Sequence, residues 1–329
     1  MKAAGRAGEV RRVLVVKPGS MGDVVHALPV AAALARAWPE ARIGWLVDRR
    51  WAPLLAGNPH LSWTVEFPRE EFRGPAGLLR GAAWFVGLRR LGPDLCLDLQ
   101  GLLRSGLMAF ASGARETVGM GDAREGARFF YQKSSRVVPG EHSVIRYLRI
   151  LEPLGINIPA QPEFPLPPGV RPPGAPDGRF VLVNPAARGV GKSLPPDALA
   201  ALLDGLAGGP PVVVVGGGGG GTVSGTIDLR GRTSLDGLIW LVRNAAAVVS
   251  VDSGPSHLAA ATGRPLLAIH TWADPRAVGP FSDSALVWQS GHISPWRDCR
   301  NRPGGPPDAL QAAAIARAAR ELAGEAPCI

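Results

Sequence analysis

The 329-residue sequence is poor in cysteine and charge, and it has no long hydrophobic run. Its three cysteines, Cys96, Cys299 and Cys328, show no CxxC or other metal-ligand spacing. They argue against a disulfide scaffold and favour a reducing compartment. No run reaches the roughly 18 apolar residues of a membrane-spanning helix, so we expect none. The first residues are polar and charged, so we also expect no signal peptide.

Charged residues make up 19% and apolar residues 46% of the chain, a balance that predicts folded domains rather than disorder. This length is comfortable for two domains. The net charge of +9 is uneven, because residues 1–170 hold 22 Lys and Arg against 15 Asp and Glu. The excess predicts an anionic partner for the first half, such as nucleic acid, anionic lipid or a phosphorylated sugar. Alternatively, arginine is simply common in this sequence.

Strand-like runs alternate with helix-like segments, which predicts an α/β protein with mostly parallel sheets and helices on both faces. Strands are expected at residues 13–16, 43–47, 63–67, 95–99, 180–183, 212–215, 247–251 and 266–270. Helices are expected at about residues 24–37, 75–91, 141–154, 196–207, 234–245, 255–262 and 308–323. An irregular, arginine-rich stretch is expected between about residues 112 and 140.

A proline-rich stretch, residues 158–178, separates the two series of elements and predicts a stiff linker. We therefore expect a Rossmann-like domain over residues 1–165, a linker over 166–178 and a second such domain over 179–329. The last helix can pack back on the first domain. A cleft between two domains of this kind is a natural small-molecule site.

Residues 17–29, with the sequence KPGSMGDVVHALP, follow the first predicted strand and open a helix. The turn therefore lies at the carboxyl end of a strand, where open α/β sheets bind ligands. One carboxylate, Asp23, stands near the start of this helix. On this stretch alone it is either a helix cap or a site residue.

Residues 250–258, with the sequence SVDSGPSHL, likewise follow an apolar strand and open a helix. Backbone N–H groups at a helix N-terminus attract phosphate. Ser253 and Gly254 are small enough to let a diphosphate approach. Taken alone, Asp252 is equally well explained as a helix cap, and His257 as a packed core histidine.

A third stretch, NPAARGVGKS at residues 184–193, follows the first predicted strand of the second domain. It satisfies a relaxed P-loop pattern, which would indicate a Mg²⁺-dependent NTPase. Against this, Pro195 and Pro196 fall where the P-loop helix should run on from Lys192. Arg188 and Lys192 can instead neutralise a diphosphate as it leaves, or belong to a solvated basic loop.

Together these stretches resemble the bacterial lipopolysaccharide heptosyltransferases of glycosyltransferase family 9, most closely the heptosyltransferase I branch. Residues 17–26 are similar to the N-terminal signature, and residues 98–105, DLQGLLRS, to a stretch typical of that branch. The remaining matches, in chain order, are residues 124–125, 130–131, 142, 146, 250–257 and 271–275. The resemblance runs from about Val13 to Asp274.

The resemblance implies a GT-B fold, in which two Rossmann-like domains face each other across a cleft. It also implies inverting transfer of a heptose from ADP-heptose to the Kdo of the lipopolysaccharide inner core. Asp23 would then be the general base for the acceptor hydroxyl, and Lys192 would act at the leaving diphosphate. No acidic pair of the DxD type stands near a donor loop, so we expect no obligatory metal and no other cofactor.

The resemblance also assigns residues to each substrate and domain. The donor set, on the second domain, is Arg188, Lys192, Asp252, Ser253, Gly254, His257 and Asp274. The acceptor set, on the first domain, is Ser20, Met21, Gly22, Gln100, Arg104, Arg124 and Tyr131. The basic residues expected to touch a phosphorylated lipid A acceptor are Arg104, Arg124, Arg128, Lys133 and Arg136, although individually most are equally well read as ordinary solvated charges.

The implied partners are the nucleotide-sugar donor, a lipid A–Kdo acceptor and the inner-leaflet membrane surface, with no nucleic acid. The enzyme would be cytoplasmic and peripheral on the inner face of the inner membrane. The basic, amphipathic segment 78–90 can lie against that leaflet. Alternatively, its apolar side packs into the protein core.

The donor side departs from the family pattern. Alanines at 186–187 replace a usual hydroxyl-bearing pair, and Leu194 replaces a tryptophan. Relatives have a glycine-rich turn and then a glutamate-rich helix, with a glutamate that helps to hold the nucleoside. Here six glycines stand at 216–221, no acidic residue follows before Asp228, and the segment looks shortened, so we expect a mobile loop. The sequence therefore leaves open whether the donor is ADP-heptose, another nucleotide-heptose or a nucleotide-hexose. The alternatives are another family 9 transferase (heptosyltransferase II or III type, or a capsule enzyme), a P-loop NTPase, and a non-catalytic sugar-nucleotide-binding protein.

Overall fold

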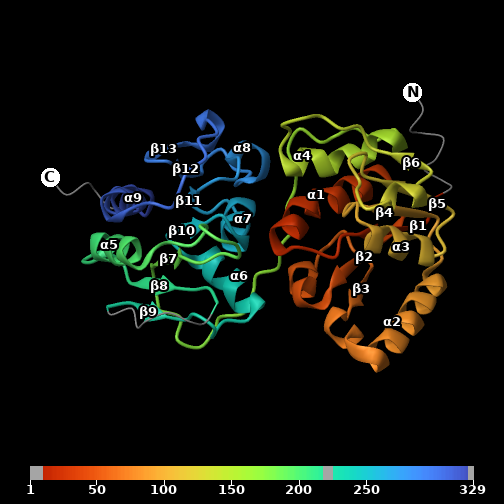
Figure 1. The fold of residues 1–329 in the computed structure, drawn as a ribbon, viewed down its shortest axis with the longest axis horizontal. Coiled ribbons are helices and arrows are strands. Elements are labelled where there is room, and N and C mark those ends of the chain that lie inside the picture. The colour runs from red at the N-terminus through yellow and green to blue at the C-terminus, as the bar shows by residue number, and fades with distance from the viewer. Residues whose placement is uncertain (1–9, 218–224, 325–329) are drawn as a thin grey trace. The chain divides into compact units, whose positions relative to one another are not determined.

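The computed structural model describes residues 10–217 and 225–324 (Figure 1). The chain divides into two compact units, Met1–Pro167 and Pro168–Ile329. The division falls inside the proline-rich stretch, which carries no helix or strand between residues 158 and 178. Of the glycine run at 216–221, only Gly216 and Gly217 lie within the described residues, so the expectation of a mobile loop falls largely outside them.

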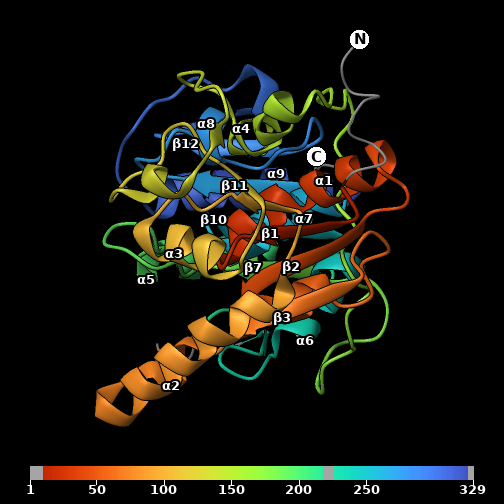
Figure 2. The same ribbon diagram turned by 90° about the vertical axis from the view of Figure 1, so that its right-hand side faces the viewer.

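In the described part of the first unit, six parallel strands pair in the order β3-β2-β1-β4-β5-β6. The strands are β1 (Arg12–Val16), β2 (Arg42–Asp48), β3 (Trp63–Phe67), β4 (Leu95–Asp98), β5 (Glu116–Gly119) and β6 (Lys133–Ser134). The helices are α1 (Met21–Ala37), α2 (Gly74–Leu88), α3 (Leu103–Ala111) and α4 (Ser143–Leu148) (Figure 2).

In the described part of the second unit, seven strands pair in the order β13-β12-β11-β10-β7-β8-β9, and only β12 and β13 are antiparallel. The strands are β7 (Val181–Asn184), β8 (Val212–Val214), β9 (Ile227–Asp228), β10 (Ala247–Val251), β11 (Leu266–His270), β12 (Leu286–Gln289) and β13 (His292–Pro295). The helices are α5 (Pro196–Leu206), α6 (Leu235–Asn244), α7 (Gly254–Ala261), α8 (Pro275–Val278) and α9 (Ala309–Leu322).

The central strands of both sheets are mostly apolar and buried along their whole length, as expected for parallel strands covered on both faces. Their register brings chemically important loops together. Val16 at the end of β1 pairs with Asp98 at the end of β4. Ser250 in β10 pairs with Asn184 at the end of β7. In each unit, two loops therefore emerge side by side at the carboxyl edge of the sheet.

Some predicted boundaries were wrong. The stretch expected to be irregular contains β5 and β6, and the sequence analysis also missed β9, α8 and the β12–β13 hairpin. These elements have only two to four residues each, too few for a periodic pattern. Helix α1 begins at Met21 rather than near residue 24, because Ser20 serves as its N-cap.

The last helix, α9, uses its buried face within the second unit. Ile315 and Ala316 belong to the same apolar core as β7, β8 and β10. Gly205 of α5 lets the two helices approach closely, because a Cβ there would lie 2.6 Å from the Cβ of Ala316.

Cys96 and Cys299 are free and buried, and Cys328 lies outside the described residues. Within the described ranges, no helix combines the length and apolar character needed to cross a bilayer.

Candidate active site

Asp23 lies in the first turn of α1, at the carboxyl edge of the first sheet. The backbone N–H and the hydroxyl of Ser20 both donate to its Oδ2, at 3.0 and 2.8 Å. The phenol of Tyr147, from α4, donates to its Oδ1 at 2.7 Å. The carboxylate therefore closes a capping interaction and also joins a wider cluster. Its side chain remains 38% exposed, so a hydroxyl from solvent can reach it.

The cluster is built on a buried lysine. Lys17 directly follows β1 and is only 1% exposed. Its ammonium donates to the Tyr147 phenol at 2.9 Å and to the Leu99 carbonyl at 3.4 Å, and it lies 3.9 Å from Oδ1 of Asp23. One lysine thus connects the start of α1, the end of β4 and α4. Neither Lys17 nor Tyr147 was among the predicted site residues.

This cluster keeps Asp23 ionised. Burial pushes the pKa of the carboxyl upward, but the Lys17 charge and the hydrogen bonds from Tyr147 and Ser20 outweigh it, so the pKa is lowered. Burial and the neighbouring carboxylate raise the pKa of the Tyr147 phenol well above its ordinary value. Tyr147 therefore keeps its proton near neutral pH and goes on donating it to Asp23.

A second carboxylate, Asp98, lies at the end of β4 and is fully buried. It accepts hydrogen bonds from the Tyr131 phenol at 2.6 Å and the Ser105 hydroxyl at 2.8 Å. The backbone N–H groups of Gln100 and Gly101 donate to its other oxygen. Burial nevertheless raises the pKa of Asp98. Its role in the structure is to fix the loop that follows β4.

The predicted acceptor residues divide into two groups. Ser20 contacts Asp23, and Tyr131 and Gln100 surround Asp98, while Met21 and Gly22 form the first turn of α1. Arg104 and Arg124 are exposed and show no contact with either carboxylate. The guanidinium of Arg104 instead lies 5.9 Å from the ring centre of Phe67.

In the second unit, the N-terminus of α7 is tied to the loop after β7. The side-chain amide of Asn184 donates to the Ser253 hydroxyl at 2.7 Å and to the Ser250 hydroxyl at 3.2 Å. It also donates to the Ala186 carbonyl at 3.1 Å. Ser253 is the N-cap of α7, and Gly254 is its first residue. The predicted phosphate-binding helix start is therefore held in a fixed position beside the basic loop.

The basic loop presents Lys192 to this helix start. Its ammonium forms a 2.6 Å ion pair with Oδ2 of Asp252 and lies 4.6 Å from the ring centre of Trp272. Burial pushes the pKa of Asp252 upward, yet His270 and Lys192 hold it below its ordinary value. Burial lowers the pKa of His270 to about 4, so this residue is neutral at pH 7. Lys192 therefore carries the local positive charge.

The other donor candidates have varied surroundings. Arg188 is exposed on the same loop as Lys192, and His257 is buried in α7. Asp274 caps the short helix α8 by accepting from the Arg276 N–H at 2.9 Å, which is a structural use of its carboxylate. Across residues 10–217 and 225–324, no group of three or more His, Cys, Asp or Glu is placed to hold a metal ion.

The P-loop interpretation is wrong for this loop. A P-loop requires its helix to begin at the lysine, so that N–H groups of that helix surround the phosphates. Here residues 185–195 are irregular, and α5 begins only at Pro196. The loop closes instead through the Ser193 hydroxyl, which accepts from the Ala187 N–H at 3.1 Å.

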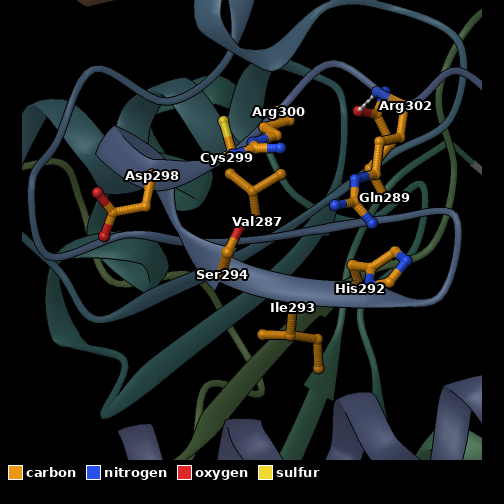
Figure 3. Close-up of a pocket in the computed structure, with 9 residues that line it drawn as sticks. All are labelled: Val287, Gln289, His292, Ile293, Ser294, Asp298, Cys299, Arg300 and Arg302. Atoms are coloured by element: carbon orange, nitrogen blue, oxygen red, sulfur yellow. Dashed lines mark hydrogen bonds between the residues drawn. The ribbon is translucent and has the colours of Figure 1, made fainter.

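A cavity of about 160 Å³ lies elsewhere in the second unit, between the β12–β13 hairpin and the segment that follows it (Figure 3). In Figure 3, His292 and Arg302 lie on one side of the view and Asp298 on the other. The residues that line the cavity are Val287, Gln289, His292, Ile293, Ser294, Asp298, Cys299, Arg300 and Arg302. None of the predicted donor residues is among them.

Sequence reasoning missed four polar or aromatic residues, two in the cluster around Asp23 and two around Lys192 and the start of α7. Lys17 carried a signal, because a lysine directly after a buried strand needs a partner. Asn184 likewise ends a buried strand. Tyr147 carried none, because 124 residues separate it from Asp23. Trp272, which is 56% exposed, contacts Lys192 from a different loop.

The chain matches the family model described as glycosyltransferase family 9 (heptosyltransferase) over residues 83–217 and 220–302. It is 28% identical over 304 residues to lipopolysaccharide heptosyltransferase 1 of Pseudomonas aeruginosa, covering 84% of this chain and 82% of the relative. It is 25% identical over 296 residues to lipopolysaccharide heptosyltransferase 1 of Escherichia coli K12, covering 84% and 92%.

Among solved structures, the E. coli heptosyltransferase WaaC with ADP matches with a TM-score of 0.78 and 23% identity. The match covers 94% of this chain and 99% of that one. At this identity the likeness shows the fold, and it confirms the predicted GT-B architecture with two Rossmann-like units. The family match covers more than half of the chain, and the protein therefore belongs to glycosyltransferase family 9.

Proposed function

We propose that the protein transfers a heptose from ADP-heptose to the Kdo sugar of the lipopolysaccharide inner core, with inversion at the anomeric carbon. The observation that carries this proposal is the ionised, solvent-accessible carboxylate of Asp23, held by Tyr147, Ser20 and Lys17. The names of the relatives support heptose as the sugar and lipopolysaccharide as the acceptor.

Asp23 is the proposed general base. In an inverting displacement, the acceptor oxygen forms its bond to the anomeric carbon as the bond to the diphosphate oxygen breaks. The acceptor hydroxyl gives its proton to Asp23 during this step. Because the pKa of Asp23 is lowered, the carboxylate is available as a base at neutral pH. Tyr147 and Lys17 act as positioning residues.

The donor diphosphate is proposed to bind at the N-terminus of α7. The N–H groups at Ser253 and Gly254 are positioned to donate to phosphate oxygens. Lys192 would exchange its resting ion pair with Asp252 for the more highly charged diphosphate, and would stabilise the negative charge that develops as ADP leaves. Arg188, His257 and Asp274 remain proposed donor contacts. We propose that no metal takes part.

The proposed acceptor contacts are Gln100, Tyr131, Arg104 and Arg124. The acceptor is a lipid, so we also propose that the enzyme works at the inner face of the inner membrane. The competing assignment is a family 9 transferase that extends an already heptosylated core, because the two activities differ only in the acceptor.

The acceptor assay tests the assignment directly. The protein should transfer heptose from ADP-heptose to Kdo₂–lipid A, measured by mass spectrometry of the product, and it should do so equally well with EDTA present. ADP-glucose, with the same nucleotide, serves as the matched donor control. Product with a heptosylated acceptor but none with Kdo₂–lipid A would overturn the assignment. Mg²⁺-dependent ATP hydrolysis without any sugar would instead indicate an NTPase.

Asp23→Asn should lower kcat by about 10²–10⁴-fold, because the amide cannot accept the proton. Steady-state kinetics measure this loss, and thermal unfolding checks the fold. Asp308→Asn is the matched control, because Asp308 also closes a capping box, at the start of α9. If both variants keep the wild-type kcat, Asp23 is only a helix cap.

Tyr147→Phe should move the acidic limb of the kcat/KM profile to higher pH. The lost hydrogen bond is one of the contacts that lower the pKa of Asp23, and a base with a higher pKa becomes ionised only at higher pH. Tyr131→Phe, in the chain's other tyrosine, should leave this limb unmoved, because Tyr131 donates to Asp98. An unmoved limb in Tyr147→Phe would refute the positioning role.

Lys192→Met should raise the KM for ADP-heptose and lower kcat by about 10²-fold, because the charge on the leaving diphosphate loses its counter-ion. Initial rates at varied donor concentration separate the two effects. Arg230→Met removes an ion-paired cation of the same unit and should leave both constants near wild type. Wild-type kinetics in Lys192→Met would exclude this loop from the donor site.

A further inference from the structure

We infer that α2 and α3 form a docking face for an anionic lipid bilayer. This inference rests on the proposed function in one respect: the reason for the enzyme to bind a membrane is that its proposed acceptor is a lipid. Its observations concern the outer surfaces of two helices that carry neither Asp23 nor Lys192; one residue of these helices, Arg104, is also a proposed acceptor contact.

The first observation is that α2 is apolar on both faces. Gly77, Gly81 and Leu88 are buried against the unit, and Gly77 packs against the backbone of Phe72. The outward face carries Leu78, which is 72% exposed, and Val86, which is 76% exposed. Residues 78, 79, 82, 83 and 86 follow helical spacing, so they form one continuous exposed stripe.

The outward face of α2 differs from that of an ordinary surface helix. Such a helix places its large apolar side chains inward and its polar ones outward. In α2, Trp84, Phe85 and Leu88 do pack inward. On the outer side, however, two leucines and a valine face water. Packing within the unit therefore does not explain the outward leucines. The sequence analysis left open whether the apolar side of segment 78–90 is used in the core or against a membrane, and both apolar faces exist.

The second observation is that α3, which contacts α2, also carries exposed apolar side chains. Leu103 is 44% exposed, Leu107 39% and Phe110 67%, and they also follow helical spacing. The two helices contact each other and cover the same side of the first sheet, where Leu88 and Met108 share one core cluster. In Figure 2, α2 extends away from the sheet of this unit. Patches of this kind mark interaction sites.

The third observation is the charge around these stripes. Arg73 precedes α2, Arg89 and Arg90 follow it, and Arg104 lies on α3. All four are exposed, and none forms an ion pair with a carboxylate of the described residues. An apolar stripe flanked by free arginines fits a membrane surface, because the apolar side chains enter the acyl boundary while the guanidinium groups meet lipid phosphates. A second copy of this chain would bring like charges together.

Vesicle binding of the full chain tests the inference. The protein should float with vesicles of phosphatidylcholine and phosphatidylglycerol, and the bound fraction should fall as salt rises. Leu78→Glu/Leu79→Glu should lower the partition constant at least about tenfold, because two leucines no longer enter the lipid. Leu310→Glu is the matched control, since Leu310 is 81% exposed on α9 of the other unit, and it should bind as wild type does.

Two results would overturn the inference: equal vesicle binding by wild type and the α2 double variant, or a wild-type dimer in light scattering that the double variant dissociates. Arg89→Glu/Arg90→Glu should weaken binding to the anionic vesicles only. Transfer to a deacylated, water-soluble Kdo acceptor should be unchanged in the leucine double variant. If wild type binds vesicles but transfers no heptose to any Kdo acceptor, the proposed function fails while the docking face stands.

Discussion

The first unit depends on satisfying one buried charge. The Lys17 ammonium is almost completely removed from water, and an ammonium in that position is costly unless it is paired and hydrogen-bonded. Burial lowers the pKa of Lys17, and the charge of Asp23 opposes that shift. The three partners of the ammonium come from a helix start, a strand end and a second helix. Satisfying this charge therefore fixes the position of the carboxylate proposed to act as the base.

The second unit solves a related problem in a different way. Lys192 lies on an irregular loop and is partly exposed, and its partner Asp252 is tied to a buried strand. A pair of this kind can be broken and remade, because water reaches the ammonium. Under the proposed function, a diphosphate would take the place of this aspartate as the partner of Lys192. The buried Lys17 thus fixes the proposed base in place, whereas the more accessible Lys192 can exchange partners.

The sequence alone predicted those elements whose pattern lies within a few neighbouring residues. Strands β10 and β11 lie at the predicted residues, because continuous apolar runs of four or five residues bounded by turns are typical of central parallel strands. The turn that carries Asp23 and the start of α7 lie where the strand–turn–helix patterns predicted them. Tyr147 could not be found in this way, because its contact with Asp23 exists only after β1, α1 and α4 have packed together. The β12–β13 hairpin was missed because its strands, LVWQ and HISP, do not form a continuous apolar run.

Net charge is a second property that the sequence gives without locating it on a surface. The first half carries an excess of positive charge, but many of its arginines are used internally, such as Arg50 with Asp48 and Arg149 with Glu141. What an anionic partner meets is the set of cations that no carboxylate neutralises. Arg73, Arg89, Arg90 and Arg104 belong to this set and lie on or beside α2 and α3. Net charge led to the prediction of an anionic partner for the first half of the chain, and the pattern of ion pairs locates a surface on which to test that prediction.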